Sequence, residues 1–181
     1  MAILFHGSKE SLDRIADRVV ENFADRIKHH RYRRDHKIKT GGQVPQALIV
    51  DDDVESIQPL QIVLKNFGFE TTLAFDGHEA FEEIAKRSFD IVFLDICLPE
   101  MTGLEVLKEV ESYQSHAQKY AKQGHILPVV TYSSYHMEDY GIPNGEKFFF
   151  AGHWQKPVSL ADLTTLAGKT IDELGIFKRK E

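Results

Sequence analysis

Short apolar runs alternate with amphipathic stretches along residues 45–175. Runs rich in β-branched and aromatic side chains and bounded by turn residues are typical of strands buried on both faces of a parallel sheet. Between them apolar residues recur at helical spacing, which predicts helices with one buried stripe. The expected strands are 46–50, 69–75, 91–94, 127–132 and 147–155, and the expected helices are 56–67, 76–87, 103–123 and 159–174.

Turn and capping residues set the expected ends of these elements. Ser56 is the expected N-cap of its helix, with Pro59 still in the first turn, where a missing N–H costs little. Gly68 follows the last apolar position and is the expected C-cap. The stretch 135–145 contains so many glycine and proline breakers that it allows at most a short helix.

The amino-terminal segment differs in charge from the rest of the chain. Residues 1–40 hold 10 Lys+Arg and 6 Asp+Glu, a net charge of +4, so the remainder carries -10 of the total of -6. Stretch 8–39 predicts an amphipathic helix packed on its own domain or on a second copy. A basic segment that binds nucleic acid or another acidic partner is the alternative, but no DNA-binding motif accompanies it. Its apolar stripe is Leu12, Ile15, Ala16, Val19, Val20, Phe23 and Ile27.

Composition narrows the class of protein. The 181 residues contain one cysteine, Cys97, which excludes an internal disulfide framework and favours a reducing compartment. No apolar run approaches the roughly 18 residues of a membrane span. The opening MAILFHG lacks the basic start and long apolar core of a signal peptide. We therefore expect a cytoplasmic protein.

Polar residues follow four of the five expected strands. They are Asp51-Asp52, Asp95, Ser133 and Lys156. The carboxyl ends of parallel strands meet at one edge of the sheet, where such folds bind their ligands. Carboxylates gathered there would repel each other unless a cation lay among them, and an all-oxygen ligand set favours Mg²⁺. A lysine and a serine hydroxyl could contact a phosphoryl group, which Asp95 could accept as an acyl phosphate.

These residues carry a family resemblance. The motifs LIVDDD, FLDICLPEMTG, the strand-ending serine and KP follow one another in order. Segment 46–175 thereby resembles the receiver domain of two-component response regulators. The resemblance implies an α/β fold with a flavodoxin-like, doubly wound, five-stranded parallel sheet in the order 2-1-3-4-5. We expect residues 1–44 to form an amphipathic helix, a basic segment and a linker, and residues 45–181 to form the receiver domain.

The resemblance also implies roles for individual residues. Asp95 would be the phospho-acceptor and a Mg²⁺ ligand. Asp52 would bind the metal directly, Asp51 would assist, and the backbone carbonyl of Cys97 would complete the protein ligands.

On the phosphoryl side, Ser133 would contact the phosphoryl group and switch on its arrival. Ser134 is adjacent, and the distance from Pro128 favours Ser133. Lys156 would pair with a phosphoryl oxygen, and the Lys156-Pro157 bond would be cis. The position three before this lysine, which is aromatic in the family, is His153 here.

The function implied is transfer of a phosphoryl group from a histidine kinase or histidine phosphotransfer protein, followed by hydrolysis. The chain would be a single-domain regulator, a phosphorelay intermediate or a piece of a larger protein, with no enzymatic activity beyond its own phosphotransfer and autodephosphorylation. A homodimer would form through the amino-terminal helix or the family's helix 4–strand 5–helix 5 face. The alternative is an adaptor or dimerisation module that ignores phosphorylation. A Mg²⁺-dependent phosphatase would need an acid where the chain has Cys97.

Overall fold

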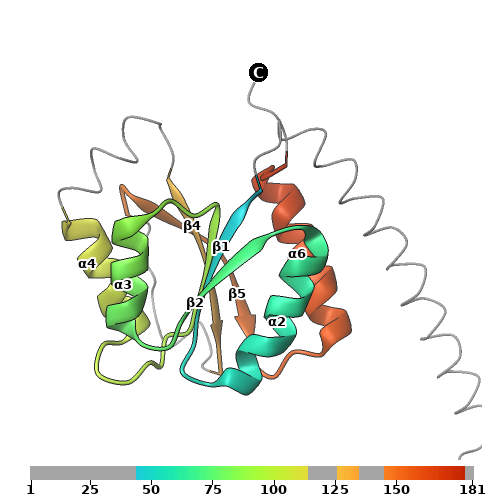
Figure 1. Ribbon diagram of the computed structural model, residues 1–181, viewed down its shortest axis with the longest axis horizontal. Coiled ribbons are helices and arrows are strands. Elements are labelled where there is room, and N and C mark those ends of the chain that lie inside the picture. The colour runs from blue at the N-terminus through green and yellow to red at the C-terminus, as the bar shows by residue number, and fades with distance from the viewer. Residues whose placement is uncertain (1–43, 114–125, 135–144, 178–181) are drawn as a thin grey trace, which may run out of the picture.

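Five parallel strands form a single sheet in the order β2-β1-β3-β4-β5 (Figure 1). The computed structural model describes residues 44–113, 126–134 and 145–177. The predicted fold class and strand order are confirmed. The strands are β1 (Gln46–Val50), β2 (Glu70–Ala74), β3 (Ile91–Leu94), β4 (Leu127–Ser133) and β5 (Phe148–Gln155).

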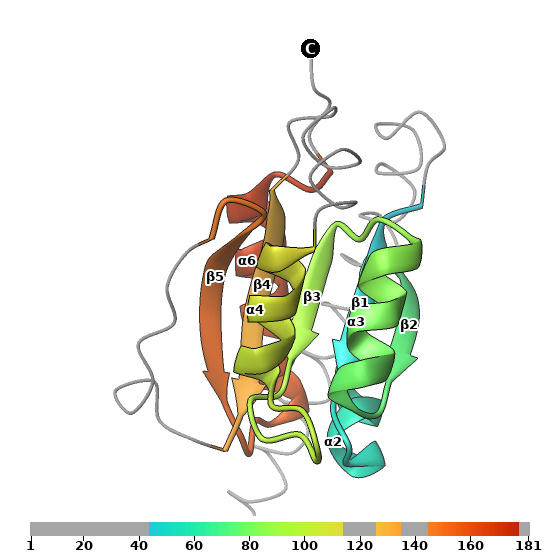
Figure 2. The ribbon, with the colours of Figure 1, turned by 90° about the vertical axis from the view of Figure 1, so that its left-hand side faces the viewer.

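Helices cover both faces of the sheet. Figure 1 shows α3 and α4 on one side of the strands and α2 and α6 on the other, and in Figure 2 the first pair lies in front of the strands. This arrangement follows from crossover connections between parallel strands. The four helices within the described residues are α2 (Val54–Phe67), α3 (Gly77–Lys86), α4 (Gly103–Ser112) and α6 (Leu160–Leu174).

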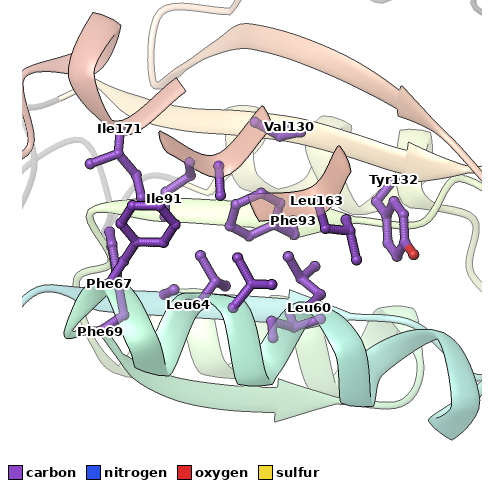
Figure 3. Close-up of a cluster of buried hydrophobic side chains, with 14 of the residues drawn as sticks. Leu60, Leu64, Phe67, Phe69, Ile91, Phe93, Val130, Tyr132, Leu163 and Ile171 are labelled. Atoms are coloured by element: carbon purple, nitrogen blue, oxygen red, sulfur yellow. The ribbon is translucent and has the colours of Figure 1, made fainter. Parts of the chain in front are cut away.

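Two apolar clusters hold the layers together. The larger lies between the sheet and the α2–α6 pair and contains most of the labelled side chains of Figure 3, among them Leu64, Phe93 and Leu163. The smaller lies between the sheet and the α3–α4 pair and includes Ile84 and Val106. Alternate residues of β1, β3 and β4 enter opposite clusters, as the period of two requires. Strands apolar on both faces therefore belong at the centre of this sheet.

The start of α2 differs from the prediction. Asp53, not Ser56, is the N-cap, and its carboxylate accepts the Glu55 N–H at 2.9 Å. The Ser56 hydroxyl donates to the same carboxylate at 3.0 Å, so this serine is held by the cap and is not the cap itself. The helix consequently begins at Val54. Pro59 lies in the second turn and not in the first, so that part of the prediction is wrong.

Helix α4 is shorter than predicted. It begins at a capping box formed by Thr102 and Glu105 and ends at Ser112, with Tyr113 as its C-cap. The Lys147 ammonium donates to the carbonyls of Glu111 and Tyr113, which satisfies groups that a longer helix would use internally. The expected helix to residue 123 is therefore wrong at this point, and residues 114–125 lie outside the described part.

Two other predictions fall outside the described residues. They are the amphipathic helix of residues 8–39 and the short helix within 135–144. The expected second strand, 69–75, is trimmed by one residue at each end. At its far end the Phe75 N–H donates to the Glu79 carboxylate at 2.8 Å and so leaves the ladder. The predicted C-cap Gly68 is confirmed, and Asp76 and Ser159 are the N-caps of α3 and α6.

Candidate functional site

Backbone hydrogen bonds fix three charged residues at the carboxyl ends of the strands. The Asp51 N–H donates to the Ala74 carbonyl of β2 at 3.1 Å, and the Asp95 N–H donates to the Val50 carbonyl of β1 at 2.9 Å. The Lys156 N–H likewise donates to a carbonyl of β4 at 2.9 Å. Each residue thus continues the ladder of its strand by one step. The sheet itself therefore brings these three side chains to one edge.

The Lys156 ammonium joins the two carboxylates. Its Nζ lies 2.6 Å from Asp95 Oδ2 and also pairs with Asp51 Oδ2. The side chains are 10%, 9% and 1% exposed for Lys156, Asp95 and Asp51. At such low exposure charge-assisted hydrogen bonds are strong, and an unpaired charge would be costly. One cation therefore compensates two buried anions.

Burial and ion pairing shift the pKa values of Asp51 and Lys156 in opposite directions. Burial raises the pKa of the Asp51 carboxyl, and the hydrogen bonds from Lys156 and the Asp53 backbone only partly offset it. For Lys156, burial would lower the pKa, but the hydrogen bonds to Asp51 and Asp95 outweigh it and the pKa is raised. The charged form of the lysine is thus favoured, while burial destabilises the charged form of Asp51 relative to its neutral form.

The second oxygen of each buried carboxylate is fixed by a tight turn. Asp51 Oδ1 accepts the Asp53 N–H at 3.0 Å, and Asp95 Oδ1 accepts the Cys97 N–H at 2.9 Å. The loop after Asp95 then returns closely, because a Cβ on Gly103 would collide with the Asp95 carbonyl. Glycine is therefore required at position 103 for the loop to close over the acceptor.

Asp52 completes an acidic cluster with these two residues. Oxygens of Asp51, Asp52 and Asp95 can all lie within 4.8 Å of one another, and Asp52 is exposed. An all-oxygen set that is open to solvent on one side suits a hard cation that keeps some of its waters, such as Mg²⁺. The residues present therefore fit the predicted metal.

Ser133 supplies a buried hydroxyl beside the cluster. It is fully buried at the end of β4, and its Oγ has no hydrogen-bond partner among the described residues. Its neighbour Ser134 is exposed, which favours Ser133 for the position that the sequence left between the two. Burial, followed by the charge of Asp95, raises the pKa of the Cys97 thiol, and the Ser133 hydroxyl opposes this. A hydroxyl without a partner at such a place is suited to a ligand.

His153 lies farther back along β5. It is half-buried, and its Nδ1 is 2.8 Å from the hydroxyl of the fully buried Thr131, its register partner on β4. Thr131 and Ser133 lie on the same face of β4, two residues apart. His153 thus contacts the strand that carries Ser133. The Lys156-Pro157 bond is cis, as expected from the resemblance.

One contact escaped the sequence analysis. The Lys156 Nζ lies 4.9 Å from the centroid of the Tyr132 ring. The only signal in the sequence was an aromatic residue directly before Ser133. That signal did not predict that the lysine following β5 would lie over the ring.

Comparison with known proteins agrees with this geometry. Residues 47–167 match the family described as response regulator receiver domain. The chain belongs to that family. Among solved structures, the chemotaxis response regulator CheY4 of Vibrio cholerae has a TM-score of 0.56 at 26% identity, over 71% of this chain and 99% of that one. The receiver domain of NtrX from Brucella abortus has a TM-score of 0.53 at 26% identity, over 70% and 98%.

Curated relatives of the receiver domain are longer proteins. Transcriptional regulatory protein ZraR of Klebsiella oxytoca is 38% identical over 72 residues, which are 40% of this chain and 16% of ZraR. Transcriptional regulatory protein DltR of Streptococcus agalactiae is 41% identical over 65 residues, or 36% of this chain and 29% of DltR. The matches thus span less than a third of either relative. Within the described residues no helix has the length and apolarity that crossing a membrane requires.

Proposed function

We propose that this receiver domain accepts a phosphoryl group on Asp95 from a phosphohistidine and thereby changes its binding to partners. The observation that carries the proposal is the meeting of Asp51, Asp95 and Lys156 beside the hydroxyl of Ser133, which has no hydrogen-bond partner in the described part of the chain. A carboxylate nucleophile, an ammonium and a free hydroxyl are the groups that phosphoryl transfer needs near the reacting phosphorus.

Each residue of the site has a distinct part. Mg²⁺, when bound, supplies charge neutralisation to the phosphoryl oxygens, and Asp51, Asp52, Asp95 and the Cys97 carbonyl would hold it. Lys156 already touches the Asp95 oxygen that would attack, so its ammonium can follow the charge onto the phosphoryl group. Ser133 donates its hydroxyl hydrogen to another phosphoryl oxygen.

The chemistry is a displacement at phosphorus. An Asp95 oxygen attacks the phosphorus of the phosphohistidine, a P–O bond forms, the P–N bond breaks, and the imidazole leaves with the electron pair and takes a proton. Hydrolysis removes the phosphoryl group: water attacks the phosphorus and gives up a proton to the solvent, the P–O bond to Asp95 breaks with its electron pair left on the carboxylate, and phosphate departs. No other reaction is assigned to the chain.

A small-molecule test addresses the proposal directly. The full chain with Mg²⁺ is treated with beryllofluoride, which imitates a phosphoryl group on a carboxylate, and amide NMR shifts are followed. Separately, acetyl phosphate is added and the intact mass is measured. We expect saturable shifts near the site and the mass gain of one phosphoryl group, and we expect Asp95→Asn to lose both.

Matched controls make the result specific. Asp90→Asn, at the opposite end of the sheet, should react like the wild type. Ser133→Ala should slow phosphorylation by about 100-fold, as loss of one donor to a developing oxyanion does, while Ser134→Ala should leave the rate unchanged. No response in the wild type would overturn the proposal and favour an adaptor that binds partners independently of phosphorylation.

The partners follow from the chemistry. We propose a histidine kinase or histidine phosphotransfer protein as donor, in the cytoplasm. Self-association through residues 1–44 or the family's helix 4–strand 5–helix 5 face is tested by measuring the oligomeric state with and without beryllofluoride. Loss of a dimer on deletion of residues 1–40 would assign it to the amino-terminal segment.

A further inference from the structure

The ring of Tyr132 lies against the ammonium group of Lys156. The Lys156 Nζ lies 4.9 Å from the ring centroid, within the range of a cation–π interaction. Tyr132 is 5% exposed and the Lys156 side chain is 10% exposed, so little water intervenes to weaken the attraction. The ammonium therefore has the two carboxylates and an aromatic ring as neighbours.

The ring of Tyr132 packs within the hydrophobic core. Tyr132 belongs to the apolar cluster between the sheet and the α2–α6 pair, and Figure 3 shows it at the end of that cluster where the β4 arrow ends. It lies opposite Trp154 in the β4–β5 register, and Trp154 packs against Phe93 with 4.9 Å between ring centroids. Since Ser133 follows Tyr132 on the other face of β4, one strand carries both residues.

We propose that Tyr132 is a positioning residue for phosphoryl transfer, acting through a cation–π contact that keeps the Lys156 ammonium at the site. This inference rests on the proposed function of Asp95. It assigns to the residue before the strand-ending serine a role that packing alone does not require.

Tyr132 is needed because phosphorylation and metal binding both change the carboxylates that pair with Lys156. In the free protein its ammonium is held by the charged carboxylates of Asp51 and Asp95. Formation of the acyl phosphate turns one of these anions into a mixed anhydride, and metal binding draws on the charge of the other. The ring of Tyr132 is unchanged by either event. It therefore retains the ammonium within reach of the new phosphoryl oxygens.

The ionisation of the phenol supports this role. Burial raises the pKa of Tyr132, and the carboxylates of Asp51, Asp53 and Asp95 raise it further against the opposing charge of Lys156. The phenol therefore stays neutral, and its contribution to Lys156 is the electron-rich face of the ring.

The test changes the electronics of the ring at nearly constant shape. Phenylalanine and its 4-fluoro, 3,5-difluoro and 3,4,5-trifluoro derivatives are placed at position 132 of the full chain, because each fluorine weakens the negative face of the ring. Beryllofluoride affinity at fixed Mg²⁺ is read from amide NMR shifts. We expect Tyr132→Phe to bind like the wild type and the trifluoro variant to bind about tenfold more weakly, with intermediate steps between them.

Stability separates positioning from packing. Urea unfolding should show at most a small loss of stability in the fluorinated variants, because fluorination weakens the contact with Lys156 but does not shrink the ring. Tyr132→Leu should lose beryllofluoride affinity by about five- to thirtyfold. The matched control, Phe93→Leu, removes a ring from the same cluster without touching Lys156 and should lose stability while keeping affinity.

The outcomes are distinguishable. A wild type that does not respond to beryllofluoride would overturn the proposed function and this inference with it. A wild type that responds, with equal affinity across the fluorinated series, would overturn the inference alone. Should Tyr132→Leu fail to fold, the fluorinated series decides by itself.

Discussion

The carboxylates at the two ends of the sheet differ in the groups that compensate their charge. At the amino ends of the strands, two carboxylates accept hydrogen bonds from the backbone of distant segments. Asp90 accepts the Gln46 N–H at 2.7 Å, and Glu111 accepts the N–H groups of Glu146 and Lys147 at 2.9 and 3.3 Å. These contacts join elements far apart in sequence. They are fixed once the chain is folded, and they contribute to stability alone.

At the carboxyl ends of the strands, the buried negative charges outnumber the positive charge that pairs with them. Asp51 and Asp95 share the single ammonium of Lys156, and the buried hydroxyl of Ser133 has no partner among the described residues. A long, movable side chain is thus the main source of compensation for two buried charges. Two buried carboxylates that depend on one ammonium cost stability, and this arrangement fits the proposed binding of a cation and a phosphoryl group there.

Removing the lysine should have the largest effect. Without divalent metal and near neutral pH, Lys156→Met should lower the free energy of unfolding by about 3 kcal/mol, because two buried carboxylates lose their cation. The loss should shrink at mildly acidic pH, since the raised pKa of Asp51 lets it take up a proton early. Urea unfolding at both pH values measures this.

The control for this variant lies at the other end. Lys147→Met removes an ammonium that donates to the carbonyls of Glu111 and Tyr113. It should cost only about 1 kcal/mol, with no dependence on pH in the same acidic range. Equal losses for the two lysines would contradict the contrast between the ends. In the wild type, the stability that the charge of Lys156 supplies should also be lost at high pH, as the pH rises through the raised pKa of the lysine.

Crowding the amino end should have the second largest effect. A Cβ on Gly145 would lie within 3.0 Å of the Glu111 carboxylate and of the Phe148 ring. Gly145→Ala should therefore cost about 2 kcal/mol, measured by urea unfolding. The carboxylate cannot move aside without losing its backbone donors. In a Glu111→Ala background the cost of Gly145→Ala should shrink, and an unchanged cost would argue against this contact.

Neutralising Asp51 should have a smaller effect of opposite sign. Its folded pKa is raised, so the free energy of unfolding falls as the pH rises from the ordinary range of aspartate through the folded pKa. Asp51→Asn removes this penalty and should stabilise the metal-free protein by about 1 kcal/mol near neutral pH. The gain should vanish in acid, and Mg²⁺ affinity should fall. Asp90→Asn, measured alongside, should instead lose about 1 kcal/mol.

The smallest effect is expected in the loop after the acceptor. Glu100 has φ of 62°, a left-handed conformation that disfavours side chains with a Cβ. Glu100→Gly should raise the free energy of unfolding by about 0.5 kcal/mol, because relief of strain slightly exceeds the added freedom of the unfolded chain. Thermal unfolding measures the change. A loss of stability would show that the glutamate side chain has a role of its own.

Much of the site could be predicted because strand ends are marked in the sequence. Asp51, Asp95 and Lys156 each directly follow an expected strand, and parallel strands bring such positions to one edge. Helix limits were harder to predict. Asp53 and Ser56 are both suitable caps, and only the hydrogen bonds show that Asp53 is used. Likewise, no local signal ends α4 at Ser112, because the donor that closes it, Lys147, comes from a distant segment.

By itself, the sequence determined the layers and the chemistry of the strand ends, because alternation and turn residues act within a few positions of one another. Only the tertiary structure decided which of two serines is buried, how one ammonium is divided between two carboxylates, and that Tyr132 lies beneath Lys156. Those features depend on the register between β4 and β5 and on the packing of α2 and α6. Contacts across strands join residues whose sequence separation carries no information about their distance.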